Sequence, residues 1–197
     1  MPLDEIISIV RVNDVILEIG NVPETDYVKV EAMLNAASRR LETLCNTLFK
    51  TRTITRRMIG SSYPNLDLGA PIQSITSVVL NGQALVEGND YYSEMDQGLL
   101  VRLSGWSGST FTADPRNVEV TAVLGWDPIP YDVQLACKLL VKHWYQGFGR
   151  DSTLRSEKFT EYAYERFAPS QEGNPNTGDL PEEVRSLALP YRRWNFG

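Results

Sequence analysis

Residues 118–136 read VEVTAVLGWDPIPYDVQLA, and this stretch contains the change of pattern that decides the fold class. From Asn117 to Leu124, apolar and polar residues alternate and β-branched residues are frequent, which predicts a strand. Residues 125–130 contain one glycine and two prolines, which end the strand, and proline is tolerated in the first turn of a helix. Apolar residues then recur at helical spacing and predict a helix over Tyr131–Gln146. The chain therefore combines strands with helices.

The predicted helix over 131–146 has a wide apolar surface. One stripe is formed by Val133, Ala136, Cys137, Leu140 and Trp144. Leu135, Leu139 and Val141 widen it beyond the face that an ordinary surface helix buries. Such a helix is either central in its own domain or packed against a neighbouring subunit. For the second alternative, the candidate intersubunit residues are Leu135, Leu139 and His143.

Two further helices are predicted near the N-terminus. Over Glu24–Leu48, apolar residues return every three or four positions with polar residues between them, which indicates an amphipathic helix with one buried stripe. A shorter helix is predicted over Val12–Ile19, with Asn13 as its N-cap and Gly20 as its end. The first quarter of the chain is therefore expected to be helical.

The region between these helices has the pattern of an antiparallel sheet. Asn81-Gly82 follows an alternating segment and is a strong signal for a two-residue hairpin turn. Ser104–Arg116 is rich in serine and glycine and is expected to be a loop. The predicted class is α+β, with N-terminal helices, a central antiparallel β-sheet of hairpins, a long helix in the C-terminal half and an extended C-terminal arm. The other strands are expected at Thr51–Ile59, Asn65–Leu68, Ile72–Leu80, Asp90–Met95 and Gly98–Leu103.

The C-terminal part of the sequence divides the chain into two parts. Residues 156–167 fit both a helix and a strand, and we favour a strand. Residues 169–179 form a polar linker rich in proline and glycine, which cannot bury enough apolar area to fold alone. We therefore expect a core domain over 1–168, and over 169–197 a flexible linker with a C-terminal docking arm.

Apolar and aromatic residues return after this linker. Arginine next to aromatic residues is the composition of interface anchors, so we expect this end of the chain to bind a partner. The candidate docking residues are Leu187, Leu189, Tyr191, Arg192, Arg193, Trp194 and Phe196.

Composition and motifs argue against several classes of protein. The 197 residues include 42% hydrophobic and 22% charged residues, as in an ordinary globular domain. The net charge of −6 and pI of about 4.9 differ from the basic footprint of proteins that grip nucleic acid. Apolar runs are far too short to cross a membrane, and the N-terminus has neither the basic start nor the apolar stretch of a secretory signal.

No catalytic, cofactor or metal site is predicted. The chain has one histidine, His143, in the middle of a predicted helix and without an obvious partner. Cys45 and Cys137 fall on the apolar stripes of different helices, where cysteine is usually a small buried residue, so neither a disulfide nor a zinc site is indicated. Nucleotide-binding glycine motifs are absent from the sequence.

The succession of segments resembles the head-tail connector proteins of tailed bacteriophages, also called adaptor or head completion proteins. The resemblance covers about residues 24–146 and, more loosely, 180–193, and no single motif in it is diagnostic. The segments in order are NAASRRLETLCN (35–46), LGAPIQSITSVV (68–79), NDYY (89–92), VEVTAVLG (118–125), IPYDVQLA (129–136) and LPEEVRSLALPYRR (180–193).

This resemblance implies a structural virion protein rather than an enzyme. It implies a homo-oligomeric ring, typically dodecameric, that assembles in the host cytoplasm onto the capsid portal and becomes part of the neck between head and tail. A downstream neck, stopper or tail protein would bind its other side, and DNA would pass through the ring without sequence-specific binding. The docking residues at 187–196 would then bind the portal. The linker over 169–179 and the loop over 104–116 depart from shorter family members, so their fit to the neck is open.

Three alternative functions are also compatible with a chain of this composition. A stopper or tail-completion protein of the same neck would also be small and non-enzymatic, but we expect it to contain less helix. A small hydrolase would depend on His143 as its base. A DNA-binding regulator would bind duplex DNA with a steep dependence on salt.

Overall fold

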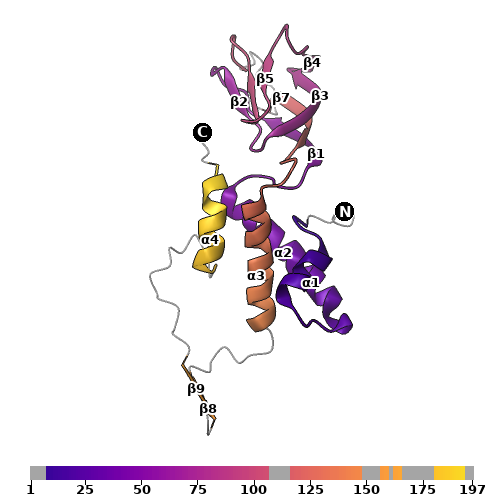
Figure 1. Ribbon diagram of the computed structural model, residues 1–197. Helices are drawn as coiled ribbons and strands as arrows, with labels where there is room; N and C mark the ends of the chain where they lie inside the picture. Colours follow the sequence, from indigo (N-terminus) through magenta and orange to yellow (C-terminus); the bar gives the residue numbers. More distant parts are fainter. Residues whose placement is uncertain (1–7, 107–115, 148–155, 160–161, 166–179, 194–197) are drawn as a thin grey trace.

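The computed structural model describes residues 8–106, 116–147, 156–159, 162–165 and 180–193, and every structural statement below refers to these residues. They form a helical layer at one end of the molecule, two β-sheets at the other, and a separate two-stranded hairpin (Figure 1). The α+β class predicted from the sequence is confirmed. No helix in the described ranges is both long and apolar enough to span a membrane.

The longest helix, α2 (Tyr27–Cys45), follows the predicted apolar stripe. Val30, Leu34, Ala37, Leu41 and Cys45 are all fully buried. A 3-10 turn, η1 (Glu24–Asp26), precedes the helix, which therefore begins slightly later than predicted. It also ends earlier, because Asn46 adopts the left-handed conformation (φ 49°), a common way for the last carbonyls of a helix to find backbone donors.

The first helix, α1 (Val12–Ile19), ends at Gly20 with φ +96° as predicted, but its N-cap was predicted wrongly. Arg11 is the N-cap, because its carbonyl accepts hydrogen bonds from the amides of Asp14 and Val15. Asn13 consequently lies inside the first turn. The chain before the helix is fixed where the amide of Ile9 donates to the hydroxyl of Ser38 in α2, at 3.1 Å.

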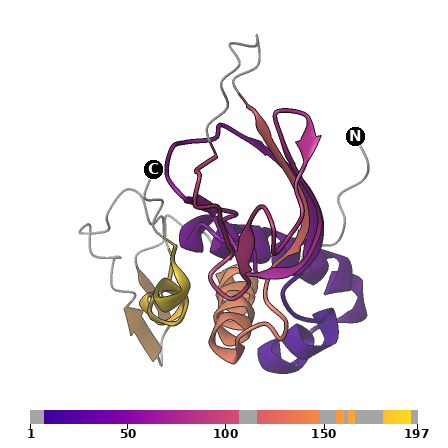
Figure 2. The ribbon, with the colours of Figure 1, turned by 90° about the horizontal axis from the view of Figure 1, so that it is seen from above.

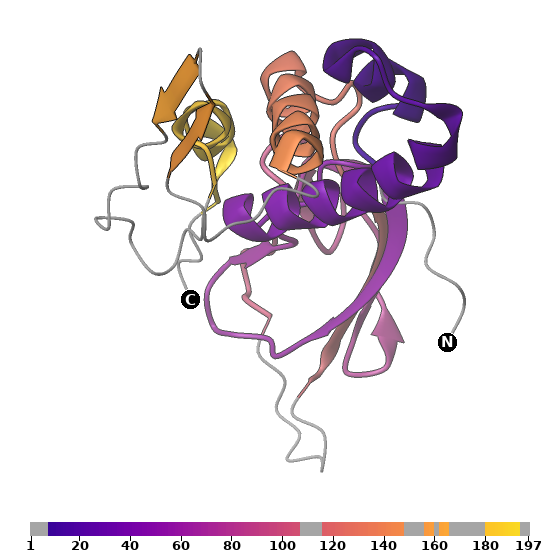
Figure 3. The same ribbon diagram turned by 90° about the horizontal axis from the view of Figure 1, so that it is seen from below.

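The helix α3 (Tyr131–Gly147) occupies the centre of the helical layer. Figure 3 shows it between α4 (Glu182–Ala188) and α1, with α2 crossing beside all three. Its wide apolar surface is therefore covered mainly within one subunit, which is the first of the two alternatives that the sequence left open. Val133, Ala136, Cys137, Leu140 and Val141 are fully buried in the core that these helices share.

The larger sheet is antiparallel and has the order β1 (Arg52–Met58), β7 (Val118–Leu124), β3 (Ile72–Leu80) and β4 (Gln83–Ala84). Alternate residues of β7 are buried, as its alternating sequence predicts. Asn81 and Gly82 have φ values of 54° and 82°, so the predicted hairpin turn between β3 and β4 is confirmed. Seen along the long axis, this sheet is a curved layer (Figure 2).

A smaller antiparallel sheet packs against the larger one, in the order β2 (Asn65–Asp67), β6 (Leu99–Val101) and β5 (Tyr92–Glu94). Its inner face contributes Leu66 and Leu100 to a second apolar core. Trp106 is fully buried there, and its indole N–H donates to the carbonyl of Pro64 at 2.7 Å. The strands predicted around the turn at 96–98 and at 65–68 are confirmed.

The ambiguous segment near residue 160 forms a hairpin of β8 (Ser156–Phe159) and β9 (Tyr162–Glu165), which confirms the strand interpretation. Most of the predicted loop over 104–116 and the whole linker over 169–179 lie outside the described residues.

The two layers are joined where the chain passes from α2 to β1 and from β7 to α3. These two connections touch: a Cβ on Gly125 would lie 2.7 Å from the Cα of Thr51, and Gly125 has φ +136°, so only glycine suits this position. The amide of Trp126 also donates to the carbonyl of Phe49, at 3.0 Å. We call this junction of the two layers the waist.

Candidate functional site

The candidate docking residues begin in a helix, which differs from the extended arm expected over 169–197. Residues 182–188 form α4, followed by a 3-10 turn, η2 (Leu189–Tyr191). Val184 and Ala188 are fully buried against α2 and α3, and Leu187 packs at the edge of the same core. Their spacing of three and four residues gives the segment one apolar face, and docking that face stabilises a helix too short to persist alone.

Tyr191 packs against two aromatic side chains at the waist. Its ring meets Phe49 edge-on at 6.3 Å between centroids and Trp126 at 5.7 Å, with interplanar angles of 80° and 89°. Its hydroxyl donates to a carboxylate oxygen of Asp132 at 3.2 Å. Desolvation, followed by this hydrogen bond, raises the pKa of the Tyr191 phenol.

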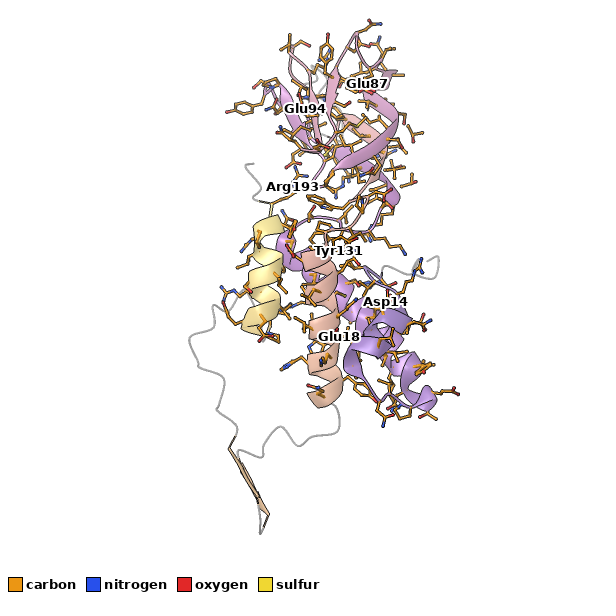
Figure 4. All side chains as sticks on the ribbon, in the orientation of Figure 1. Asp14, Glu18, Glu87, Glu94, Tyr131 and Arg193 are labelled. Atoms are coloured by element: carbon orange, nitrogen blue, oxygen red, sulfur yellow. The ribbon has the colours of Figure 1, made fainter. Side chains whose placement is uncertain are left out.

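Arg193 connects three parts of the molecule. Its backbone N–H donates to the carbonyl of Cys45 at the end of α2, at 2.8 Å. Its guanidinium donates to the carbonyl of Gln97 and lies 3.4 Å from the carboxylate of Asp67 in the smaller sheet. Residue 193 therefore ties the C-terminal segment to both layers at the waist, where Figure 4 labels it.

The close approach of Arg193 depends on Gly98, which has φ +66°. A Cβ there would overlap the carbonyl oxygen of Ala70 and lie 2.8 Å from the Arg193 guanidinium. Only glycine therefore lets the turn between β5 and β6 pass this close to the C-terminal segment.

A buried ion pair fixes the other side of the waist. Glu42, near the end of α2, accepts a hydrogen bond from the backbone N–H of Phe49 at 3.0 Å and forms an ion pair with Arg52 of β1 at 2.9 Å. Because Glu42 is only 8% exposed, the pair is shielded from water and holds the first strand against the helix.

The seven candidate docking residues thus do not form one free surface. Leu187, Leu189, Tyr191 and Arg193 are half-buried on the chain's own helices and sheet, and Arg192 is exposed. Trp194 and Phe196 lie outside the described residues. The sequence indicated the segment but not the surface of the same chain that it contacts. This surface is formed by Cys45, Phe49, Asp67, Gln97 and Trp126.

The three candidate intersubunit residues on α3 differ in exposure. Leu135 is 42% exposed, His143 is exposed, and Leu139 packs partly against the helical core. Tyr131, one turn before Leu135 on the same side of the helix, is 85% exposed. A short apolar surface on α3 therefore remains open beside the covered one.

The described residues offer little reactive chemistry. They contain no cluster of three or more histidine, cysteine, aspartate or glutamate side chains that could hold a metal ion. Both cysteines are buried free thiols. Burial raises the pKa of Cys45 to about 12 and that of Cys137 to about 11, so both remain protonated and weakly nucleophilic at neutral pH.

Solved structures of similar fold come from phage-like particles. A chain from the neck of an empty gene transfer agent (GTA) particle, computed with C6 symmetry, has a TM-score of 0.65 at 16% identity, over 99% of this chain and 96% of that one. A chain from the neck of the native GTA particle, computed with C12 symmetry, has a TM-score of 0.55 at 17% identity, over 86% and 85%. A chain from the virion of the native GTA particle has a TM-score of 0.59 at 16% identity, over 95% and 92%.

At these identities the similarity concerns the fold. No protein of curated function matches the chain in sequence. A family profile, described as head completion protein (HCP), matches residues 5–194, which include both layers and the C-terminal segment. This chain therefore belongs to the head completion protein family.

Proposed function

We propose that the protein is a structural subunit of a virion neck, where copies of it form a ring between the capsid portal and the next neck component. The observation that carries this proposal is the family match over residues 5–194. The shared fold with chains from GTA necks computed with C6 and C12 symmetry supports a ring, most simply a dodecamer. In this role the protein would have no catalytic activity, and DNA would pass through the ring.

Contacts between copies are proposed at the open apolar surface of α3. Tyr131 and Leu135 are exposed one turn apart, and Leu139 and His143 continue the same side of the helix. Exposed apolar residues in adjacent turns are typical of an interface rather than of a solvated helix face.

The C-terminal segment is proposed to bind the portal. Because Tyr191 and Arg193 already contact the waist, we assign them to holding the end of the chain in place, together with Leu187 and Leu189. Arg192 is exposed next to them, and Trp194 and Phe196 follow in sequence. Arginine and aromatic side chains carry much of the binding energy in protein interfaces, so these three would form the portal contact.

The charge of the chain fits a ring through which DNA passes. A net charge of −6 repels phosphate, so DNA would slide through the ring rather than be held by it. This distinguishes the proposal from a DNA-binding regulator, which should bind duplex DNA at low salt.

Mass measurement of the purified protein, alone and with purified portal rings, tests the proposal. Truncation of the chain after Pro169 would remove the residues proposed to bind the portal, but it would also remove Val184 and Ala188 from the helical core. A loss of portal binding could then result from misfolding. We therefore choose deletion of residues 194–197, with Asn195→Ala as the matched control. We expect portal binding to be lost in the deletion and kept in the control. Full portal binding by the deletion would disprove the C-terminal contact, and a wild-type protein that forms no ring with the portal would disprove the function.

A further inference from the structure

The outer face of the smaller sheet carries apolar residues among polar ones: Tyr92, Leu99 and Val101 share it with Asn65, Asp67 and Glu94. In this sheet, Val101 of β6 pairs with Asn65 of β2 on one side and with Tyr92 of β5 on the other, so all three share one face. The opposite face is the buried one. On the outward face Tyr92 is 60% exposed, whereas the solvent side of an antiparallel sheet is normally polar.

This apolar surface continues beyond the ends of the strands. The amide of Arg102 donates to the carbonyl of Pro64 at 2.8 Å, which extends the β2–β6 pairing by one residue, and the chain then turns, because the amide of Gly105 donates to the carbonyl of Arg102 at 2.8 Å. Leu103 is 89% exposed and Tyr63 is 74% exposed. Both therefore add exposed apolar area at the edge where β6 ends and β2 begins. We call Tyr63, Tyr92, Leu99, Val101 and Leu103 the distal face.

Carboxylates are frequent in the part of the chain that carries the distal face. Residues 58–101 contain five carboxylates and no lysine or arginine, a net charge of −5, of which Asp67 is paired with Arg193 at 3.4 Å. Glu94 is exposed on the same strand as Tyr92, and Figure 4 shows Glu87 and Glu94 at the end of the molecule opposite the helical layer. The five carboxylates are Asp67, Glu87, Asp90, Glu94 and Asp96.

We propose that the distal face is a docking surface for the neck component that follows the ring, and that this partner presents an apolar surface surrounded by lysine and arginine. The inference rests on the proposed function, which assigns the portal to the C-terminal segment and leaves the distal face for the other neighbour. Exposed apolar side chains call for a protein partner, and the acidic surroundings select a basic one. The same carboxylates repel DNA.

A second copy of the chain fits this surface less well. Two distal faces would bring carboxylates together. Two arginines of the basic segment 39–57 already have acidic partners within the subunit: Arg52 pairs with Glu42 at 2.9 Å, and Arg57 pairs with Glu119 at 2.6 Å. These arginines are therefore already engaged before another copy approaches.

The test reverses charge on the distal side and, separately, removes apolar area. One variant carries Glu94→Lys with Asp96→Lys, and another carries Tyr92→Ser with Leu103→Ser. The control carries Asp14→Lys with Glu24→Lys, which makes the same change of charge at exposed positions of the helical layer. Binding of the full-length protein, in the assembly state that it adopts, is measured against the purified next neck protein over a series of salt concentrations. Ring mass, portal binding and melting temperature are recorded for every variant.

We expect both distal variants to bind the next neck protein at least about tenfold more weakly than wild type, with a shallower salt dependence for the charge reversal. The control should bind within about twofold of wild type, and ring mass and portal binding should not change. Undiminished binding by both distal variants would overturn the inference while leaving the proposed function intact. A lost ring would instead identify the distal face as a contact between copies, and lost portal binding alone would identify it as the portal site; either result also overturns the inference. Failure of wild type to form a ring or bind the portal would count against the proposed function separately.

Discussion

Tyr191→Ala removes the aromatic side chain through which the C-terminal segment contacts the waist. Replacing a fully buried aromatic side chain by alanine costs about 3–5 kcal/mol, and because Tyr191 is half-buried we take about half of that, ~2 kcal/mol. Losing the edge-to-face contacts with Phe49 and Trp126 adds about 0.5 kcal/mol each at the lower end of the usual range. We therefore expect the free energy of unfolding to fall by about 3 kcal/mol.

Equilibrium unfolding in urea, followed by tryptophan fluorescence, measures this change. With a denaturant slope of about 2 kcal/mol per molar urea, the midpoint should fall by about 1.5 M. Tyr191→Phe is the control, since it keeps the ring and loses only the hydrogen bond to Asp132, worth about 0.5 kcal/mol. An alanine variant within about 0.5 kcal/mol of wild type would refute the docking of the segment at the waist.

Three further outcomes follow from the waist and the helical core. Glu42→Ala leaves Arg52 without its buried partner and should lower stability by about 3 kcal/mol, measured by urea unfolding. Gly98→Ala should lower the melting temperature by several degrees more than Gly88→Ala, because both glycines have positive φ but only Gly98 meets neighbouring atoms. The two cysteines have pKa values raised by the fold, so their contribution to stability is complete below about pH 8.5 and is lost as pH rises towards 12. Native protein at pH 8 should therefore react with a thiol reagent only as fast as it unfolds.

Local patterns in the sequence predicted most of the elements. The stripe of α2 and the alternation of β7 each arise from neighbours a few residues apart, and the Asn81-Gly82 turn depends on two residues alone. The cap of α1 was missed because Arg11 acts through its backbone carbonyl, which any residue possesses.

The docking of the C-terminal segment could not be predicted in the same way. Tyr191 contacts Phe49, and Arg193 contacts Cys45 and Asp67, so the partners are more than a hundred residues apart in the chain. The composition at 191–194 indicated an interface anchor, but composition does not say whether the contact lies in another protein or in the same chain. Gly98 gave no signal of this contact in the sequence, because its role is visible only when the turn and Arg193 are seen together.

The touching connections at Gly125 and Thr51 mean that the sheet region enters and leaves the helical layer at one point. In architectural terms, residues 52–124 are an insertion between two helices, with adjacent entry and exit like those of an inserted domain. Such a region can grow, shrink or be exchanged without changing how α1, α2 and α3 pack. The surface presented to one neighbour in an assembly could thus diversify while the helical framework stays the same.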